Sequence, residues 1–242
     1  MEGTDQRIAA AATGVAIASG AAMTTPETPA SFQVGNSVSV LNDPGSARAE
    51  SVGVLRAQIL GQHIRHGRRA LAICATQANV GCTVLAVELA VSLAQVGLKT
   101  LLIDADLRRP AIDQHIAPSR PVPGLLHYLQ DEDVALTDVI QYDALPGLSL
   151  LYAGGTVAAP QELLARSRFR DLVDRCMRDF DITILDTPPS NASADARRVA
   201  FVAGYAAIVA GRNRTFVHDV EVLADELRAD RTTLVGTVMI DA

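Results

Sequence analysis

The chain of 242 residues is almost without lysine: Lys99 is the only one, and the other basic residues are arginines. It has only three cysteines, none of them spaced like a zinc finger or a redox CxxC pair. Three cysteines also cannot close a disulfide framework, so the cysteine pattern predicts a reducing, cytoplasmic location. A positive charge excess is missing too, since the formal net charge is −6. This charge argues against broad nucleic-acid binding.

A convincing targeting segment is also missing. Residues 8–23 are apolar but short for a membrane span, and they contain no leucine. Glu2 and Asp5 stand against a single Arg7, which is unlike the start of a secretion signal. We therefore expect residues 1–45 to be a flexible, low-complexity tail and residues 46–242 to form one domain. A signal peptide or anchor is the disfavoured alternative.

Continuous apolar runs alternate with segments of helical periodicity. Such runs suit strands buried on both faces of a parallel sheet. The expected strands are Ala70–Ala75, Thr100–Ala105, Leu148–Ala153, Ile182–Asp186, Ala206–Ala210 and Leu234–Ile240. The expected helices are Ala47–Gly61, Thr83–Val96, Ser167–Asp179, Ala194–Val202 and Val217–Ala229. This order predicts an α/β fold with a doubly wound, mostly parallel sheet.

The turn after the first expected strand has the position of a P-loop, between a strand and an amphipathic helix. A working P-loop curls backbone N–H groups around phosphate, neutralises it with a lysine and binds Mg²⁺ through a Ser or Thr hydroxyl. Gly81 and Thr83 fill two of these positions, and Asn79, which tolerates a left-handed backbone, replaces a glycine. The lysine position is Cys82. The loop shape is therefore expected to persist without its charge.

Acidic residues end two of the other strands, and the carboxyl edge of an open α/β sheet is where ligands bind. Asp104 and Asp106 follow one apolar run, and Asp186 ends another. Together with Thr83 these acids could converge on one Mg²⁺ ion. A lone acid at a strand end is more often a cap or turn residue, but three around a loop in this position favour a nucleotide-binding fold.

Another cation could compensate for the absent lysine. Lys99 is expected at the opposite edge of the sheet, whereas Arg108 and Arg109 follow Asp106 at the correct edge. Which of these two arginines would reach the phosphates is left open. Cys82 has two interpretations as well: a reactive thiol at a helix N-terminus, or a small neutral filler, which we favour.

The stretch LLIDADLRRP (101–110) resembles the second Walker motif of the bacterial tyrosine autokinases, or BY-kinases. ILDTPP (184–189) is similar to that family's Walker B region, and the resemblance covers roughly residues 45–240. It implies a deviant-Walker, SIMIBI-type P-loop fold that binds ATP and Mg²⁺. It also implies that Asp104 and Asp186 serve Mg²⁺ and that Asp106 assists the tyrosine hydroxyl. The expected partner is a membrane polysaccharide co-polymerase, which would hold the chain at the inner membrane.

The sequence departs from that family in four places. Cys82 replaces the Walker lysine, and the family's tyrosine-rich tail is not seen after Ile240. The family's ring-assembly pattern keeps Glu50 and Arg56, but its middle arginine is Gly53, which weakens a helix by about 1 kcal/mol. The asparagine that often ends the last strand is also missing, which bears on adenine recognition.

These departures predict a regulatory, pseudokinase-like subunit of exopolysaccharide or capsule export. An active but atypical ATPase or tyrosine kinase, with an arginine standing in for the lysine, is the alternative. A ParA/MinD-type partitioning ATPase, a nitrogenase-iron-protein-like subunit and a small-molecule kinase fit less well, because the first wants an early P-loop lysine and the second wants paired cluster cysteines.

Overall fold

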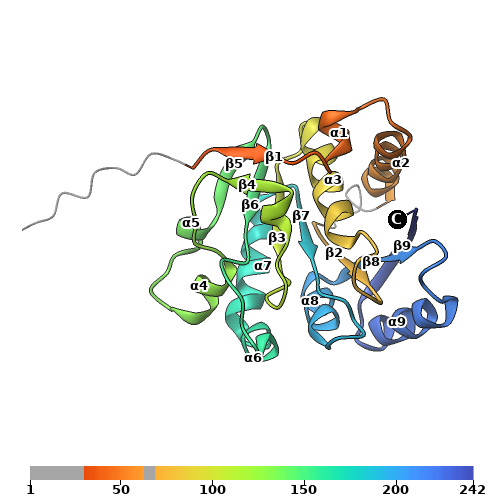
Figure 1. The fold of residues 1–242 in the computed structure, drawn as a ribbon. Coiled ribbons are helices and arrows are strands. Elements are labelled where there is room, and N and C mark those ends of the chain that lie inside the picture. Colours follow the sequence, from red (N-terminus) through yellow and green to blue (C-terminus); the bar gives the residue numbers. More distant parts are fainter. Residues whose placement is uncertain (1–29, 63–68, 242) are drawn as a thin grey trace, which may run out of the picture.

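A seven-stranded sheet forms the centre of the computed structural model, which describes residues 30–62 and 69–241 (Figure 1). Its order is β5-β6-β3-β7-β2-β8-β9, and each neighbouring pair is parallel except the antiparallel pair β5-β6. The strands span β2 (Ala70–Ala75), β3 (Thr100–Asp104), β5 (Gln141–Leu145), β6 (Leu148–Leu151), β7 (Ile182–Asp186), β8 (Tyr205–Gly211) and β9 (Thr233–Ile240).

Burial explains why the apolar runs become strands. Every residue of β2, β3, β6 and β7 is buried, as continuous apolar runs predict for strands covered on both faces. All six expected strands are present, with ends that differ by no more than a residue or two. The prediction of a doubly wound, mostly parallel α/β sheet is confirmed.

Helices cover the two faces of the sheet. On one face α3 (Cys82–Gln95) packs against the central strands, and α2 (Ala47–Gln62) packs on α3. On the other face α7 (Ser167–Asp179), α8 (Asp195–Ala203) and α9 (Val217–Ala229) pack against the sheet (Figure 1). The five expected helices are therefore confirmed.

Several short elements carry no clear sequence signal and were not expected. They are the helices α4 (Leu125–Gln130), α5 (Leu136–Val139) and α6 (Pro160–Leu164), the edge strand β5, and one turn of 3-10 helix at Ile112–Gln114. Most of them connect β3 to β7 by way of β6, and their length is too short for periodicity to reveal them.

The expected tail boundary at residue 45 is wrong, because residues 30–46 pack on the domain. This N-terminal strap contains β1 (Phe32–Val34), which pairs with β4 (Ile116–Pro118), and α1 (Ser39–Asn42). Val38 and Val40 within it are buried. The Pro-Gly turn at residues 44–45 is a bend inside the fold and not the end of a linker. The remainder of the expected tail, residues 1–29, lies outside the described residues.

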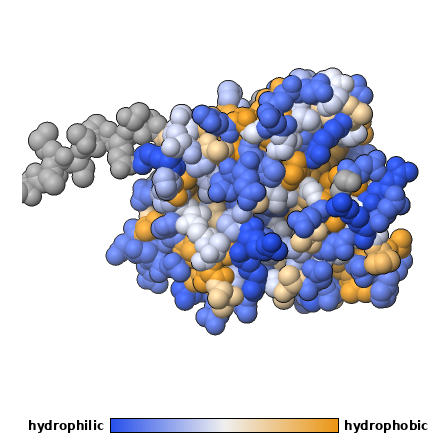
Figure 2. All heavy atoms as spheres, viewed as in Figure 1, coloured by the Kyte–Doolittle hydropathy of each residue, from blue (hydrophilic) through white to orange (hydrophobic). Residues whose placement is uncertain are grey.

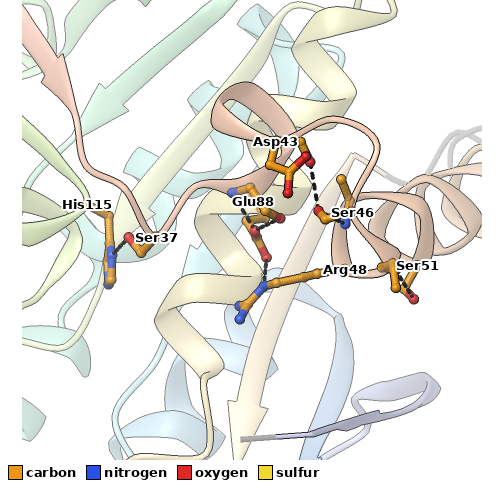
Figure 3. Close-up of polar contacts among 10 residues, drawn as sticks. Ser37, Asp43, Ser46, Arg48, Ser51, Glu88 and His115 are labelled. Atoms are coloured by element: carbon orange, nitrogen blue, oxygen red, sulfur yellow. Dashed lines mark hydrogen bonds and ion pairs between the residues drawn. The ribbon is translucent and has the colours of Figure 1, made fainter.

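A buried carboxylate fastens the strap to α3 (Figure 3). The Glu88 side chain is fully buried and accepts hydrogen bonds from the Ser39 backbone N–H (2.9 Å), the Ser39 hydroxyl (2.5 Å) and Arg48 Nε (2.7 Å). A buried charge is tolerated when it is paired and hydrogen bonded in this way. Glu88 therefore joins α1, α2 and α3 at one point.

The surface is mixed in character. Figure 2 shows small apolar islands among hydrophilic residues on the face in view. Among residues 30–62 and 69–241, no helix combines the length and the apolar character needed to cross a bilayer.

Candidate nucleotide site

A cavity of about 510 Å³ opens at the carboxyl edge of the sheet, where β2, β3 and β7 end. Its walls are the loop between β2 and α3, the segment after β3, and the Thr187–Pro189 segment after β7. This is the crevice in which open α/β sheets bind ligands. The position expected from the sequence for a phosphate site is therefore hollow and accessible.

The loop between β2 and α3 adopts the left-handed turns that the sequence suggested. Asn79 has φ 60° and Gly81, the N-cap of α3, has φ 87°. Asn tolerates this conformation better than most residues, so the loop bends at the expected positions. The first turn of α3 then directs its free N–H groups toward the cavity, an arrangement suited to anions.

Two residues that the sequence analysis missed brace this loop. Gln77 Nε2 donates to the Arg214 carbonyl (2.9 Å), and Arg214 Nη1 donates to the Asn79 carbonyl (3.2 Å). Arg214 belongs to the connection between β8 and α9 and lies 135 residues from Asn79 in the chain. No local pattern marks such a contact, because it depends on β8 lying beside β2.

Cys82, in the lysine position, is turned inward. Its Sγ donates to the Ile73 carbonyl at 3.3 Å, beneath the loop. Burial raises the pKa of the Cys82 thiol well above its usual value, and the charge of Asp186 raises it further. A reactive thiolate needs a lowered pKa, so the raised pKa and the inward hydrogen bond favour the neutral-filler interpretation.

Asp104 and Asp186 lie side by side at the ends of adjacent parallel strands. Asp104 accepts hydrogen bonds from the backbone N–H groups of Asp106, Ala111 and Ile112, at 3.1–3.2 Å. Burial raises its pKa to about 7; the neighbouring Asp106 also raises it, and the hydrogen bonds act in the opposite direction. Asp104 thus organises the loop after β3 as well as contributing charge.

Asp186 has an unusual deficit of partners. Both of its carboxylate oxygens are buried, and neither accepts a well-formed hydrogen bond from the described residues, although the Thr83 and Cys82 side chains lie close enough to interact with them. Burial raises its pKa well above the usual range and Asp104 raises it further, while the adjacent Thr83 and Cys82 side chains lower it. A buried carboxylate without donors either holds a proton or faces a cation. Thr83 lines the cavity and Asp186 lies next to it, so the two side chains together fit Mg²⁺.

Asp106 lines the cavity and is held by its own loop. One oxygen, Oδ1, accepts hydrogen bonds from the backbone N–H groups of Arg108 (3.0 Å) and Arg109 (2.9 Å). These bonds fix the carboxylate at the mouth of the site. The structure thus brings together all the predicted acids and Thr83 around the loop of Asn79, Gly81 and Cys82.

Arg108 is the exception among the predicted site residues, because its side chain turns away from the cavity. Its Nε donates to Asp195 at 2.6 Å, and its Nη atoms donate to Gln161 Oε1 (2.7 Å) and the Ala158 carbonyl (3.2 Å). Asp195 is buried at the start of α8, so the guanidinium is drawn there to neutralise it. The expectation that Arg108 binds the cofactor is corrected.

Of the two arginines expected to reach the phosphate site, Arg108 and Arg109, it is Arg109 that lines the cavity. It is exposed, and its side chain forms no hydrogen bond or ion pair with the described residues. Lys99 lies far from this edge, with Nζ 5.0 Å from the centre of the Phe180 ring. Arg109 is therefore the cation with freedom to approach a ligand in the cavity.

The cavity also touches the N-terminal strap, through its wall residues Gln114 and His115. Ser37 Oγ and His115 Nδ1 are hydrogen bonded at 2.7 Å (Figure 3). The Gly35 N–H donates to the His115 carbonyl. Burial lowers the pKa of His115. The strap thereby supports the wall opposite the P-loop, a contribution that the sequence analysis missed.

The residues of the expected assembly pattern lie on α2. Glu50 is exposed, but Arg56 Nη1 donates to the Ser92 hydroxyl (2.9 Å) and the Ser92 carbonyl (3.3 Å) of the same chain. Arg56 is thus partly engaged within its own protomer. Glu50 is the freer of the two for contact with another copy.

Comparisons with known proteins agree with this geometry. A family model described as "AAA domain" matches residues 68–216. A putative tyrosine-protein kinase CapB of Staphylococcus aureus is 31% identical over 158 residues, which are 65% of this chain and 68% of that protein. The tyrosine-protein kinase ptk of Acinetobacter johnsonii is 30% identical over 67% of this chain, but the chain spans only 22% of its length.

Solved structures show the same likeness. The kinase domain of the Escherichia coli tyrosine kinase ETK superposes with a TM-score of 0.77 at 27% identity, covering 85% of this chain and 80% of that one. The cell division ATPase MinD of Pyrococcus furiosus superposes less well, with a TM-score of 0.58 at 19% identity over 71% of each chain. The second likeness concerns the fold alone.

Proposed function

We propose, from the premise that this chain belongs to the bacterial tyrosine-protein kinase family of P-loop ATPases, that it is a pseudokinase-like regulatory subunit of capsule or exopolysaccharide production. In this proposal it binds Mg²⁺ and a nucleotide weakly and transfers phosphate slowly if at all. The observation that carries the proposal is the inward, neutral Cys82 at the position where a P-loop places its lysine.

The phosphate charge would be poorly balanced at this site. Backbone N–H groups at the start of α3 provide hydrogen bonds, but the described residues place no lysine at the cavity. Losing a charge-assisted contact to phosphate in a partly enclosed site costs on the order of a hundredfold or more in rate. Weak turnover is therefore the expected property of the chain.

The metal-binding half of the site is better preserved. Thr83 and Asp186 would hold Mg²⁺, and Asp104 would add negative charge beside them. The metal would supply charge neutralisation between the acids and a bound phosphate. Retained acids without the lysine support nucleotide sensing in preference to efficient catalysis.

An active, atypical ATPase or tyrosine kinase is the alternative, and Arg109 is the observation that favours it. Its unpaired side chain lines the cavity beside Asp106, the residue that would assist an acceptor hydroxyl. An arginine grips phosphate oxygens in bidentate fashion, so it could replace part of the missing ammonium charge. The ParA/MinD-type reading has only the likeness of fold in its favour.

The decisive experiment measures Mg-ATP affinity by calorimetry, and ATP turnover and phosphotyrosine formation, for the wild type, Cys82→Lys and Cys82→Ser. We expect Cys82→Lys to gain about tenfold or more in affinity or turnover, because it restores the missing charge, while Cys82→Ser changes little. Arg109→Gln separates the alternative. If the wild type turns over at rates like those of its relatives and loses them in Arg109→Gln, the chain is an enzyme and the pseudokinase proposal is wrong.

We further propose that the chain works at the inner membrane, from the cytoplasmic side, through a membrane polysaccharide co-polymerase, and that copies associate through the Glu50 face of α2. The family membership and the exposure of Glu50 support this proposal. Membrane recovery from cells with and without the neighbouring export genes tests the partner. Undiminished membrane recovery without those genes would count against it.

A further inference from the structure

A second hollow lies apart from the nucleotide cavity. It is an open groove of about 620 Å³ between α8 and the turn from α9 to β9. The residues that shape it include Arg197, Arg198 and Phe201 on one side and Asp230 and Arg231 on the other. It shares none of its lining residues with the nucleotide cavity.

The centre of this arginine groove is an aromatic ring between two guanidinium groups. Phe201 is 38% exposed, and the Cζ atoms of Arg170 and Arg198 lie 5.6 Å and 5.5 Å from the centre of its ring. Arg198 is fixed by donating to the carbonyls of Leu164 and Ala165, both at 3.0 Å. Carbonyl acceptors orient a guanidinium but leave its positive charge uncompensated.

The local charge is positive although the chain as a whole has a net charge of −6. Arg197 is neutralised by Asp230 (2.7 Å) and Glu226 (3.2 Å). The Arg198 side chain has only the carbonyl partners, and the side chains of Arg170 and Arg231 form no hydrogen bond or ion pair with any residue in the described ranges. Arg170 and Arg198, which lie beside the Phe201 ring, and Arg231, which lines the groove, therefore have no carboxylate partner among the described residues.

The backbone at Arg231 adds an independent observation. Arg231 follows α9 with φ 63°, a left-handed conformation that helix ends usually give to glycine or asparagine. An arginine at this position is less favoured by the backbone than a glycine would be. Arg231 lines the same groove as Phe201.

We propose that the arginine groove docks an acidic segment of a partner protein, with carboxylates on Arg170, Arg198 and Arg231 and apolar atoms on Phe201. Charge complementarity supports an anionic occupant, because guanidinium groups pair with carboxylates in planar, bidentate fashion. A peptide can enter a concave groove and contact its floor, whereas a flat bilayer would contact only the rim. The shape therefore favours a peptide. The docking site is independent of whether the nucleotide cavity is active.

The test uses the full chain and a fluorescein-labelled oligo-glutamate peptide, with oligo-glutamine as the uncharged control, followed by fluorescence anisotropy. We expect binding of oligo-glutamate alone, weakening as salt rises because the contacts are electrostatic. The double variant Arg170→Gln/Arg231→Gln should bind about tenfold more weakly, since two charge-assisted contacts are lost. Both side chains are exposed and neither forms a hydrogen bond or ion pair with the described residues, so their replacement should leave the melting temperature nearly unchanged.

Arg228→Gln is the matched control. Arg228 is an exposed arginine of α9 that pairs with Asp225 and lies outside the groove, so the variant changes the net charge without touching the site. We expect its affinity to remain within about twofold of the wild type, as for other surface charges. Arg231→Glu alone serves as a second variant and should also abolish most binding.

Three results would overturn the proposal. The first is no binding of oligo-glutamate at low salt. The second is an equal loss in Arg228→Gln and in the groove variants, which would show that only net charge matters. The third is co-sedimentation with phosphatidylglycerol vesicles that depends on Arg170 and Arg231 without any peptide binding, which would make the surface a membrane site.

Discussion

Asp104 and Asp186 are direct neighbours across the parallel strands β3 and β7, and both are buried. Two carboxylates placed this closely in a poorly solvated site cannot both ionise without cost. The pKa of Asp104 rises to about 7 and that of Asp186 rises well above its usual range, in each case chiefly through burial. The two carboxylates therefore repel each other when both are ionised, unless the pair binds a proton or a cation.

The first prediction concerns pH and stability in the absence of Mg²⁺. The folded chain retains a proton that an unfolded aspartate, with a pKa of about 3.9, has already released. Raised folded-state pKa values mean that the free energy of unfolding falls as pH rises from about 4 to about 7. Urea denaturation at a series of pH values in EDTA measures this pH dependence of the free energy of unfolding. Asp186→Asn should flatten the dependence and Asp225→Asn, an exposed control, should not.

The second prediction concerns metal and nucleotide together. Mg²⁺ binds the deprotonated acids, so the rise in melting temperature caused by Mg-ADP should be larger at pH 8 than at pH 6. Asp186→Asn should abolish the metal-dependent part, because it replaces one carboxylate oxygen with an amide NH2 and removes the negative charge that would bind the metal. A shift in melting temperature that is equal at both pH values and persists in the variant would contradict a metal site at Asp186.

The third prediction concerns the pair of Arg108 and Asp195. Arg108→Ala should destabilise the chain by about 3 kcal/mol, because the Asp195 carboxylate would remain buried without its cation. Arg228→Ala breaks an exposed pair and should cost about 0.5 kcal/mol or less. Chemical denaturation of both variants compares them directly, and similar costs would show that the buried pair has no special role.

The fourth prediction compares two glycines. A Cβ atom at Gly124 would lie 2.2 Å from the Tyr152 carbonyl and 2.6 Å from the Gly154 nitrogen, so Gly124→Ala should cost more than about 3 kcal/mol or prevent folding. Gly53 is a helical position with nothing within 4 Å of the added carbon. Gly53→Ala should therefore stabilise the chain by about 1 kcal/mol. Equal effects of the two substitutions in urea denaturation would refute the steric argument.

The fifth prediction concerns Glu88. Glu88→Ala removes the acceptor that holds Ser39 and Arg48, so hydrogen exchange in β1 and α1 should accelerate by about tenfold or more while β2 and β3 remain protected. Glu221→Ala, at an exposed position of α9, is the control. Unchanged exchange in β1 would mean that the strap is held by its apolar contacts alone.

The sequence predicted the parts of this molecule that repeat a local pattern. Strands such as β2 and β7 are long buried apolar runs, and the acids at their ends follow from strand direction. What it missed depends on contacts between distant residues. Arg108 finds Asp195 at a separation of 87 residues, and the strap pairs with β4 through three residues too short to show a period.

The strap has a practical consequence for where this domain begins. A chain shortened to start at residue 46 would lose the partner strand of β4 and leave the Glu88 charge facing Arg48 alone. It would also strip His115, part of the ligand cavity, of its contacts with Gly35 and Ser37. The smallest autonomous unit therefore starts near residue 30, and the binding pocket is completed by sequence that precedes the first α/β repeat.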